Sequence, residues 1–383
     1  MQFALSDEQL LLRDTARSFV AKHCPPALAK EWDETDHFPV DLWNKMAELG
    51  WFALPFPVED GGGGGTPLEI CLIAEALAHA SLDVAMAYVG TFIPGLVIHR
   101  HGTDEQRDRY KAGLLDGAYR IAVAISEPDA GSDAAALRCA AIDRGDHYEV
   151  SGQKAWCTGA GLPGALIAAY VRTDPNAPKH RGISLLLIPN DAPGVVIRRT
   201  PTLARHLLGT NEVYFDNVRV PKDNLIGPLN GGFKLLMSGL DMEKTVMAAA
   251  YTGVAQATMD EMLTYSLQRR QFDRAIGTFQ ALAHPMADLQ TEIDASRLLA
   301  YRAAWMISDG QPCTREAAMA KLKCSETYVA AARLGMQVLA GHGFATESVM
   351  SFRWRESIVA TISGGTSQIQ RNAVAKSMGL VTY

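Results

Sequence analysis

The stretch Ile121-Ala122-Val123-Ala124-Ile125-Ser126-Glu127-Pro128-Asp129-Ala130-Gly131-Ser132-Asp133 lies where the hydrophobic pattern of the chain changes. From here to residue 220, short alternating or β-branched runs replace the helical spacing that precedes them. These runs fall at residues 121–125, 148–150, 166–171, 183–188, 195–197 and 213–220, with turn residues between them. Short strands separated regularly by turns predict a small antiparallel sandwich or barrel.

The segments on both sides of this β region predict helices. Ser6-Asp7-Glu8-Gln9 opens an apolar-periodic run with acidic residues in its first turn, and a second run starts at Pro67. Beyond residue 231, helix-forming residues predict long helices over 233–270, 279–308, 315–339 and 367–378. Helices, then strands, then helices indicate an α+β fold and not an alternating βαβ nucleotide-binding sheet.

Three domains are expected from this order. They are an N-terminal all-α domain at 1–118, a middle β domain at 119–226 and a C-terminal α-helical bundle at 227–383. A chain of 383 residues is longer than one hydrophobic core usually organises, which agrees with several domains.

Composition argues against several classes of protein. The net charge of −6 offers no clustered basic surface for nucleic acid. The sequence contains no run of about eighteen apolar residues, so no membrane span is expected. Residues Met1–Glu8 lack the basic and apolar pattern of a secretory signal. The six cysteines include no Cys-x-x-Cys pair, so we expect reduced thiols, no metal site and a cytoplasmic protein.

The five consecutive glycines at residues 61–65 do not form a phosphate-binding motif. A Walker loop requires Gly-Lys followed by Ser or Thr, which is absent here. Gly341-His342-Gly343 is not a dinucleotide fingerprint either, because Thr346 stands at the third glycine position. We expect a flexible surface loop at residues 61–65.

Two segments of the β region could hold a flat heterocyclic ligand. In Ser126-Glu127-Pro128-Asp129-Ala130-Gly131-Ser132-Asp133, small residues allow close backbone approach, and amides and Ser132 can donate hydrogen bonds. The same segment could also be an ordinary turn. In Lys154-Ala155-Trp156-Cys157-Thr158, an indole and a hydroxyl could lie against a planar ring, although a core tryptophan before a turn is commoner.

Together these segments resemble the flavin-binding middle domain of acyl-CoA dehydrogenases. Similar segments follow in the family's order: Phe215-Asp216-Asn217-Val218-Arg219-Val220-Pro221, Gln268-Arg269-Arg270-Gln271-Phe272, Phe279-Gln280, Gln337-Val338-Leu339-Ala340-Gly341-His342-Gly343-Phe344 and Gly365-Thr366-Ser367-Gln368-Ile369-Gln370-Arg371. The resemblance covers nearly the whole chain, and the joint occurrence of these segments is specific. It implies an N-terminal helical domain, a β middle domain, a C-terminal four-helix bundle, and a homotetramer with FAD at its subunit interfaces.

The resemblance also implies contacts to the cofactor and the ligand. The isoalloxazine would lie against Val123, Ile125, Ser126, Gly131, Ser132 and a strand formed by Trp156, Cys157 and Thr158, with Thr158 facing N5. Arg269 and Gln271 would meet the pyrophosphate, with Phe272 nearby, and a guanidinium suits phosphate because it offers paired donors. Contacts across the subunit interface would come from Phe279, Gln280, Gln337, Val338, Gly341, Thr366 and Gln368. The thioester ligand would contact Ser132, Asp241, Lys244, Gly364 and Gly365.

One departure from the family pattern concerns the catalytic base. Most members carry it as the glutamate of an E-G-T motif, whereas this chain has Gly364-Gly365-Thr366 there. A minority, isovaleryl-CoA dehydrogenase among them, supplies the base from a helix whose Leu-Asp-Leu-Glu-Arg is similar to Leu240-Asp241-Met242-Glu243-Lys244. The resemblance therefore implies Glu243 as the base, with Lys244 in place of the usual arginine.

The local pattern around Glu243 agrees with this role. Its helical neighbours three and four residues away are Gly239, Leu240, Val246 and Met247, none of which is cationic. A carboxylate on an apolar face is desolvated, and its pKa should rise toward the working pH of a general base. The alternatives are a solvent-exposed glutamate or one paired across a subunit interface.

The predicted function is FAD-dependent α,β-dehydrogenation of an acyl-CoA to a 2-enoyl-CoA, with an electron-transfer flavoprotein as the electron acceptor. Three alternatives share the fold. They are oxidation of an acyl group on a carrier protein, a non-catalytic FAD-binding subunit of a hetero-oligomer, and a flavin monooxygenase. The length and branching of the acyl group are not readable from the sequence.

Overall fold

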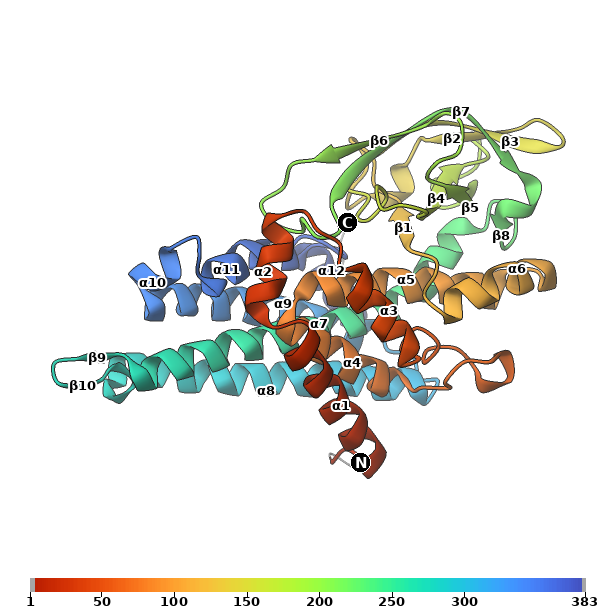
Figure 1. The fold of residues 1–383 in the computed structure, drawn as a ribbon. Helices are drawn as coiled ribbons and strands as arrows, with labels where there is room; N and C mark the ends of the chain where they lie inside the picture. The colour runs from red at the N-terminus through yellow and green to blue at the C-terminus, as the bar shows by residue number, and fades with distance from the viewer. Residues whose placement is uncertain (1–3, 381–383) are drawn as a thin grey trace. The chain divides into compact units, whose positions relative to one another are not determined.

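The computed structural model describes residues 4–380 (Figure 1). Residues 1–3, part of the segment considered for a secretory signal, lie outside the described residues, as do residues 381–383. The chain forms two compact units. One combines the chain up to Thr35 with Gly65–Met86 and everything from Asp241 onward, and the other combines Asp36–Gly64 with Ala87–Leu240.

Capping residues define the starts of three of the six N-terminal helices. The six helices are α1 (Asp7–His23), α2 (Pro26–Glu34), α3 (Val40–Glu48), α4 (Pro67–Ala80), α5 (Leu82–His101) and α6 (Asp104–Leu115). Ser6, Thr66 and Thr103 form capping boxes at the starts of α1, α4 and α6. These boxes satisfy amide groups that a helix start leaves unpaired, so each start is defined by its sequence.

Helix α5 is the one helix between residues 4 and 380 that is long and apolar enough to cross a membrane. Of its most apolar window, 89% is buried inside the protein. Tyr88 and Phe92 lie in this buried part with their rings 4.9 Å apart, and the Tyr88 hydroxyl donates to the Trp51 carbonyl at 3.2 Å. This is the environment of a core helix.

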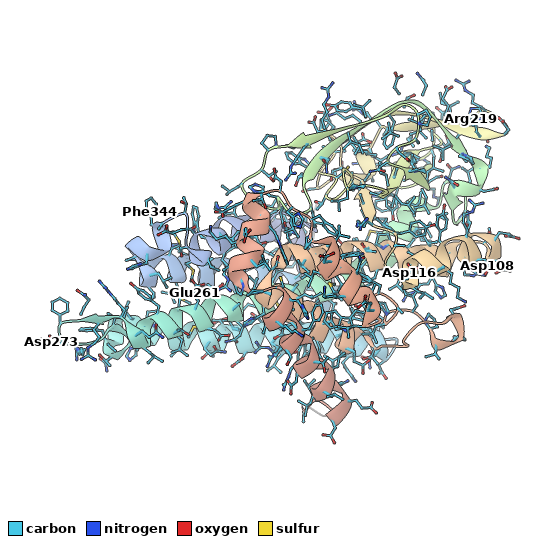
Figure 2. The ribbon with its side chains drawn as sticks, in the orientation of Figure 1. Asp108, Asp116, Arg219, Glu261, Asp273 and Phe344 are labelled. Carbon is cyan, nitrogen blue, oxygen red and sulfur yellow. The ribbon has the colours of Figure 1, made fainter. Side chains whose placement is uncertain are left out.

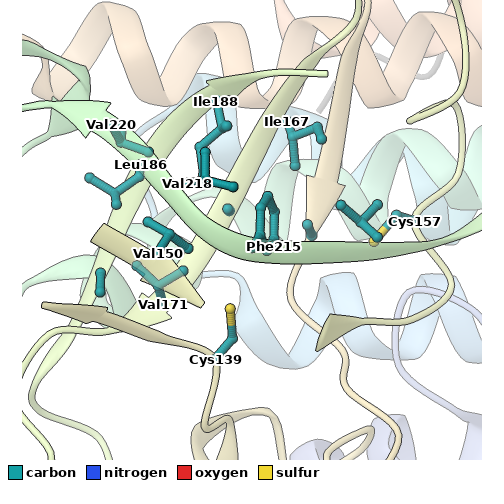
Figure 3. Close-up of a cluster of buried hydrophobic side chains, with 14 of the residues drawn as sticks. Cys139, Val150, Cys157, Ile167, Val171, Leu186, Ile188, Phe215, Val218 and Val220 are labelled. Carbon is teal, nitrogen blue, oxygen red and sulfur yellow. The ribbon is translucent and has the colours of Figure 1, made fainter. Parts of the chain in front are cut away.

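The unit that combines Asp36–Gly64 with Ala87–Leu240, here called the β unit, contains one mixed sheet of eight strands. They are β1 (Ile121–Ala124), β2 (Ala140–Asp143), β3 (His147–Lys154), β4 (Leu166–Arg172), β5 (Ile183–Pro189), β6 (Val195–Thr200), β7 (Thr210–Pro221) and β8 (Leu225–Ile226). The main path runs β6-β7-β3-β2-β4-β5-β8, and β1 pairs with β4. Most pairings are antiparallel, as predicted, but β1 and β2 each meet β4 in parallel. The hydrophobic core of this sheet includes Val150, Phe215 and the buried thiols Cys139 and Cys157 (Figure 3).

The other unit, here called the helical unit, contains the long C-terminal helices. They are α7 (Gly232–Gln268), which begins in the β unit, and α8 (Gln280–Ser308), α9 (Thr314–Leu339), α10 (Gly341–Phe344), α11 (Val349–Ala360) and α12 (Ser367–Ser377). A two-stranded hairpin of β9 (Arg270–Gln271) and β10 (Arg274–Ala275) joins α7 to α8. Helix α9 packs against α8, α11 and α12 (Figure 1). The long helices agree with the prediction, whereas the shorter helices α10 and α11 were not predicted.

A buried carboxylate connects α4 to α8. Glu75 on α4 accepts from Arg297 Nε at 2.9 Å and from the Tyr301 hydroxyl at 2.7 Å. Helix α7 also comes close to α4, because a Cβ on Gly253 would lie 2.1 Å from the Glu75 carbonyl oxygen. Only a residue without a side chain fits there.

The glycine run at residues 61–65 lies in a loop whose Gly61, Gly63 and Gly64 are exposed, in agreement with the expected surface loop. The Gly62 and Gly63 amides donate to the carbonyls of Pro57 and Ala53 at 2.8 and 2.9 Å. A Cβ on Gly62 would lie 2.2 Å from the Phe56 carbonyl oxygen. Glycine therefore brings the backbone close to its neighbours here.

The close approach of α7 and α4 gives a stability prediction. Gly253→Ala should lower the unfolding free energy by about 2 kcal/mol or more, because the new methyl group forces the two backbones apart. Gly239→Ala on the same helix is the matched control, since its Cβ would lie 3.7 Å from Ile93 and Val97. We expect the control to be neutral or stabilising by roughly 0.5–1 kcal/mol, and thermal melting of both proteins tests the difference.

Candidate active site

The two candidate flavin segments of the β unit lie side by side. The first follows β1 and the second follows β3, and the Ala155 amide donates to the Ser126 carbonyl at 2.9 Å. Reciprocal hydrogen bonds between Glu127 and Ala130, at 2.9 and 3.1 Å, close a tight turn in the first segment. Gly131 and Ser132 are exposed beyond this turn, and a Cβ on Gly131 would meet nothing within 4 Å.

The Trp156-Cys157-Thr158 segment is a loop and not the predicted strand. Strand β3 ends at Lys154, and Trp156 adopts a left-handed backbone conformation with a φ of 61°. The side chain of Trp156 is 62% exposed, which is unusual for the largest apolar side chain. A strained backbone that holds an aromatic ring in solvent is typical of a ligand site.

The next residue points the other way. Cys157 is fully buried in the sheet core (Figure 3), so its thiol is unavailable and only its backbone can face a ligand. Thr158, one residue further, is exposed.

Asn211 fixes this loop, and the sequence reading missed it. Its side-chain amide donates to the Cys157 and Gly209 carbonyls at 3.1 and 3.2 Å. Its own carbonyl accepts from the Cys157 amide at 2.8 Å. An asparagine at the start of a strand is the feature of the sequence that indicates this role, because a buried side-chain amide needs hydrogen-bond partners.

A second group of predicted residues meets in the helical unit. Arg269, Gln271, Val338 and Gly341 line one open cavity of about 560 Å³. Its other lining residues are Tyr265, Ile276, Leu339, Ala340, His342, Ala345 and Glu347. Val338 is buried, whereas Arg269, Gln271 and Gly341 are exposed. Within the described part of the chain, no ion pair holds the guanidinium of Arg269.

The hairpin beside this cavity is exposed. Asp273 lies at its tip in Figure 2, and Phe272 is 87% exposed. The rings of Phe272 and Phe279 are 6.1 Å apart, and the Arg274 guanidinium lies 3.9 Å above the Phe279 ring. Phe272, Phe279, Gln280 and Gln337 are not among the residues that line the cavity.

Glu243 lies on α7 in the helical unit and is mostly shielded from solvent. Burial raises the pKa of its carboxyl group, while the charges of Lys244 and Lys321 oppose this rise. The direction agrees with the sequence prediction. Two lysines nearby, however, were not expected from the helical neighbours alone.

Gly364 lies against the same face of α7. It has a φ of 62°, and a Cβ placed on it would lie 2.8 Å from Cε and 2.9 Å from Sδ of Met247. Met247 follows Glu243 by one helical turn, so the two share a face. The structure therefore brings the glycine that stands in the usual base position next to the helix that carries Glu243.

Lys321 on α9 holds the turn that contains this glycine. It is fully buried, and its ammonium donates to the carbonyls of Ala360 and Gly365 at 3.0 and 2.7 Å. Burial lowers the pKa of Lys321 to about 8, although Glu243 opposes the shift. Gln370 donates to the Gly364 and Gly365 carbonyls at 3.2 and 3.1 Å. The sequence reading missed Lys321, whose signal is a lysine among the alanines of a buried helix face.

The remaining predicted residues lie within α7 and at the start of α12. Lys244 is 9% exposed, and its ammonium lies 3.8 Å from the Asp241 carboxylate, which accepts from the Thr314 hydroxyl at 2.6 Å. Thr366 caps α12 by accepting from the Ile369 amide at 3.2 Å. Gln368 is exposed in the first turn of α12.

Comparison with known proteins identifies the class. Family models for the N-terminal, middle and C-terminal domains of acyl-CoA dehydrogenases match residues 6–118, 122–218 and 230–379. These enzymes are FAD-dependent oxidoreductases that act on the CH–CH bond of an acyl thioester. The chain belongs to the acyl-CoA dehydrogenase family.

Individual relatives match over almost their whole length. A probable acyl-CoA dehydrogenase of Bacillus subtilis is 35% identical over 381 residues, which cover 99% of this chain and 100% of the relative. A subunit of the caffeyl-CoA reductase–Etf complex of Acetobacterium woodii is 32% identical, with 97% and 98% covered. Glutaryl-CoA dehydrogenase in complex with glutaryl-CoA superposes with a TM-score of 0.94 at 31% identity, with 100% and 98% covered. The prolyl acyl carrier protein oxidase AnaB gives 0.93 at 25%, with 98% and 100% covered.

The raised pKa of Glu243 predicts how stability depends on pH. Because the folded state favours the neutral carboxyl, the stability that this group contributes is complete at acid pH and is lost as pH rises through the folded pKa. Glu243→Gln should therefore melt at a higher temperature than wild type near pH 8, and the gap should close toward about pH 4. Glu48→Gln, at an exposed position of α3, is the control. A gap that widens on acidification would contradict the assignment.

Proposed function

We propose that this FAD-dependent enzyme oxidises the Cα–Cβ bond of an acyl-CoA with Glu243 as the base that removes the α-proton. The observation that carries the proposal is the raised pKa of Glu243 on the α7 face against which Gly364 lies. Glycine cannot accept a proton, and Glu243 is an acidic side chain one turn from Met247, against which Gly364 lies.

The surroundings of Glu243 suit a base that works near neutral pH. A carboxylate with an ordinary pKa would be too weak to remove an α-proton efficiently, and desolvation strengthens it. The charges of Lys244 and Lys321 favour the ionised carboxylate and so oppose the rise of its pKa. Lys321 also fixes the Gly364–Gly365 turn, which lies against the face of α7 that carries Glu243.

The chain's own residues fit FAD at two places. The open cavity beside Arg269 offers a guanidinium that no ion pair holds among residues 4–380, polar Gln271 and the backbone of Gly341, which suit a pyrophosphate. The exposed ring of Trp156 and the free space beside Gly131 suit a flat heterocycle. Bound FAD supplies the acceptor for the β-hydrogen and its electron pair. Val123, Ile125, Ser126, Ser132, Cys157 and Thr158 would complete the isoalloxazine site.

The exposed hairpin supports assembly with further copies of this chain. Phe272 is 87% exposed beside a cavity that is open to solvent. A homotetramer would cover such aromatic surface and complete the cofactor sites, in which Phe279, Gln280, Gln337, Thr366 and Gln368 would take part. An electron-transfer flavoprotein is the proposed electron acceptor, and the similarity to an Etf-complex subunit supports it.

A carrier-bound acyl thioester is the second candidate substrate. It is favoured by the likeness to the prolyl acyl carrier protein oxidase AnaB over 98% of the chain. Both substrates need the same base and cofactor, so only the carrier of the thioester differs between the two candidates.

The test of the base is anaerobic mixing of the holoenzyme with a panel of acyl-CoAs and carrier-bound acyl groups, followed by flavin absorbance. Glu243→Gln should retain FAD but reduce it about 10²- to 10⁴-fold more slowly, the usual contribution of a general base. Wild-type rates in Glu243→Gln would exclude Glu243. Bleaching by carrier-bound substrates alone would favour the second candidate.

The pH dependence of the same reaction tests the role of Lys321. The base must be ionised, so flavin reduction should fall on the acid side of a pKa above the ordinary glutamate value. Lys321→Met removes a charge that lowers the pKa of Glu243, so the acid limb should move to higher pH. Lys321→Arg should restore the wild-type profile, whereas identical profiles for all three proteins would contradict this electrostatic role.

The cofactor assignment is tested by two neighbouring arginines. Arg269→Gln should weaken FAD binding by roughly 10- to 100-fold, because a charged hydrogen bond to phosphate is lost. Arg270→Gln is the control, because Arg270 donates to the Asp273 carbonyl within the hairpin. Equal losses in both variants, measured by fluorescence titration of apoenzyme with FAD, would argue against Arg269 as the pyrophosphate ligand.

A further inference from the structure

A buried ion pair lies beneath the two candidate flavin segments of the β unit. The Lys154 ammonium is 2.8 Å from Glu127 Oε1, and the two residues are 0% and 9% exposed. Neither side chain has a role in the proposed chemistry.

Both members of the pair are also hydrogen-bonded to backbone groups. Lys154 also donates to the Ile125 carbonyl at 3.1 Å. The two oxygens of Glu127 accept from the amides of Cys139 at 2.8 Å and Arg138 at 2.7 Å. The pair therefore joins the end of β1, the turn after it, the start of β2 and the end of β3.

Stability alone does not account for such a pair. Desolvation of two charges offsets much of their attraction, and apolar substitutes of similar shape are often as stable. The hydrogen bonds from this ion pair to backbone groups can instead hold several backbone segments in one conformation.

Both ends of the pair adjoin exposed site residues. Lys154 precedes the Trp156 loop by two residues, and Glu127 opens the turn that leads to Gly131 and Ser132. The Ala155 amide, between Lys154 and Trp156, bonds to the Ser126 carbonyl at 2.9 Å. A displacement of either charge would move both segments.

We propose that Glu127 and Lys154 are positioning residues that hold the Ser126–Ser132 turn and the Trp156 loop together as one flavin-binding surface. They act on FAD affinity and on the flavin environment without touching the cofactor. This inference rests on the proposed placement of FAD against these segments, but it is independent of Glu243.

The helical unit provides a matched control. Glu75 and Arg297 form a comparable ion pair at 2.9 Å, with Glu75 7% exposed and a tyrosine hydroxyl on its second oxygen. Its residues belong to α4 and α8 and adjoin none of the proposed cofactor residues in sequence. Glu75→Gln reports what the loss of a buried ion pair does to stability alone.

The experiment compares Glu127→Gln, Lys154→Met, Lys154→Arg and Glu75→Gln in the full chain. Thermal melting of apoenzyme and holoenzyme, FAD affinity by fluorescence titration, the visible spectrum and the flavin reduction potential are measured. Glu127→Gln and Lys154→Met should bind FAD about 10- to 100-fold more weakly, in line with losses of supporting contacts around bound groups, and should shift the spectrum and potential. Lys154→Arg should retain more of the wild-type FAD affinity and spectrum than Lys154→Met does.

Glu75→Gln should lower the melting temperature while its FAD affinity and spectrum stay close to wild type. The proposal is overturned if Glu127→Gln and Lys154→Met match wild type in affinity, spectrum and potential, or if Glu75→Gln changes them equally. If Lys154→Met does not fold, Glu127→Gln and Lys154→Arg decide by the same readouts. A wrong base assignment would leave these results unchanged, because Glu243→Gln alters flavin reduction and not FAD binding.

Discussion

The candidate active site depends on a left-handed turn at Gly364 that lies against helix α7. Its φ of 62° is a backbone conformation that favours glycine. A Cβ at this position would lie 2.8 Å from Cε of Met247, so the end of that flexible side chain would have to shift. The position that usually carries the base in this family therefore lies against α7, on which Glu243, the proposed base, stands one turn from Met247.

Much of the fold could be predicted from the sequence because it is encoded locally. The change from helical to alternating periodicity near residue 121 gave the α+β class, and the long helices followed from residues with high helix propensity. Tertiary contacts decided what was missed. The parallel pairing of β1 with β4 depends on partners 45 residues apart, as in the match of Ile121 with Leu166. The hydrogen bonds that the glycine loop makes to Ala53 and Pro57 could not be read from its composition either.

The candidate site likewise combines features that the local sequence predicts with features that depend on tertiary contacts. The family pattern indicated Glu243, and its desolvation followed from apolar neighbours on one helix. Lys321 could not be found this way, because it comes from α9 and its partners are the carbonyls of Ala360 and Gly365. The bend at Trp156 was likewise mistaken for a strand, since a φ of 61° at a tryptophan is held by Asn211 and not by local propensity. Functional sites often break local rules in this way.

The cysteines bear on the chemistry of the substrate. All six are free and buried, and burial raises the pKa of Cys157 to about 12 and of Cys139 and Cys313 to about 11. Acyl thioesters exchange with thiolates, so an accessible low-pKa cysteine would accept the acyl group from the substrate. With its thiols protonated and enclosed, the protein can hold an activated acyl group without becoming acylated itself.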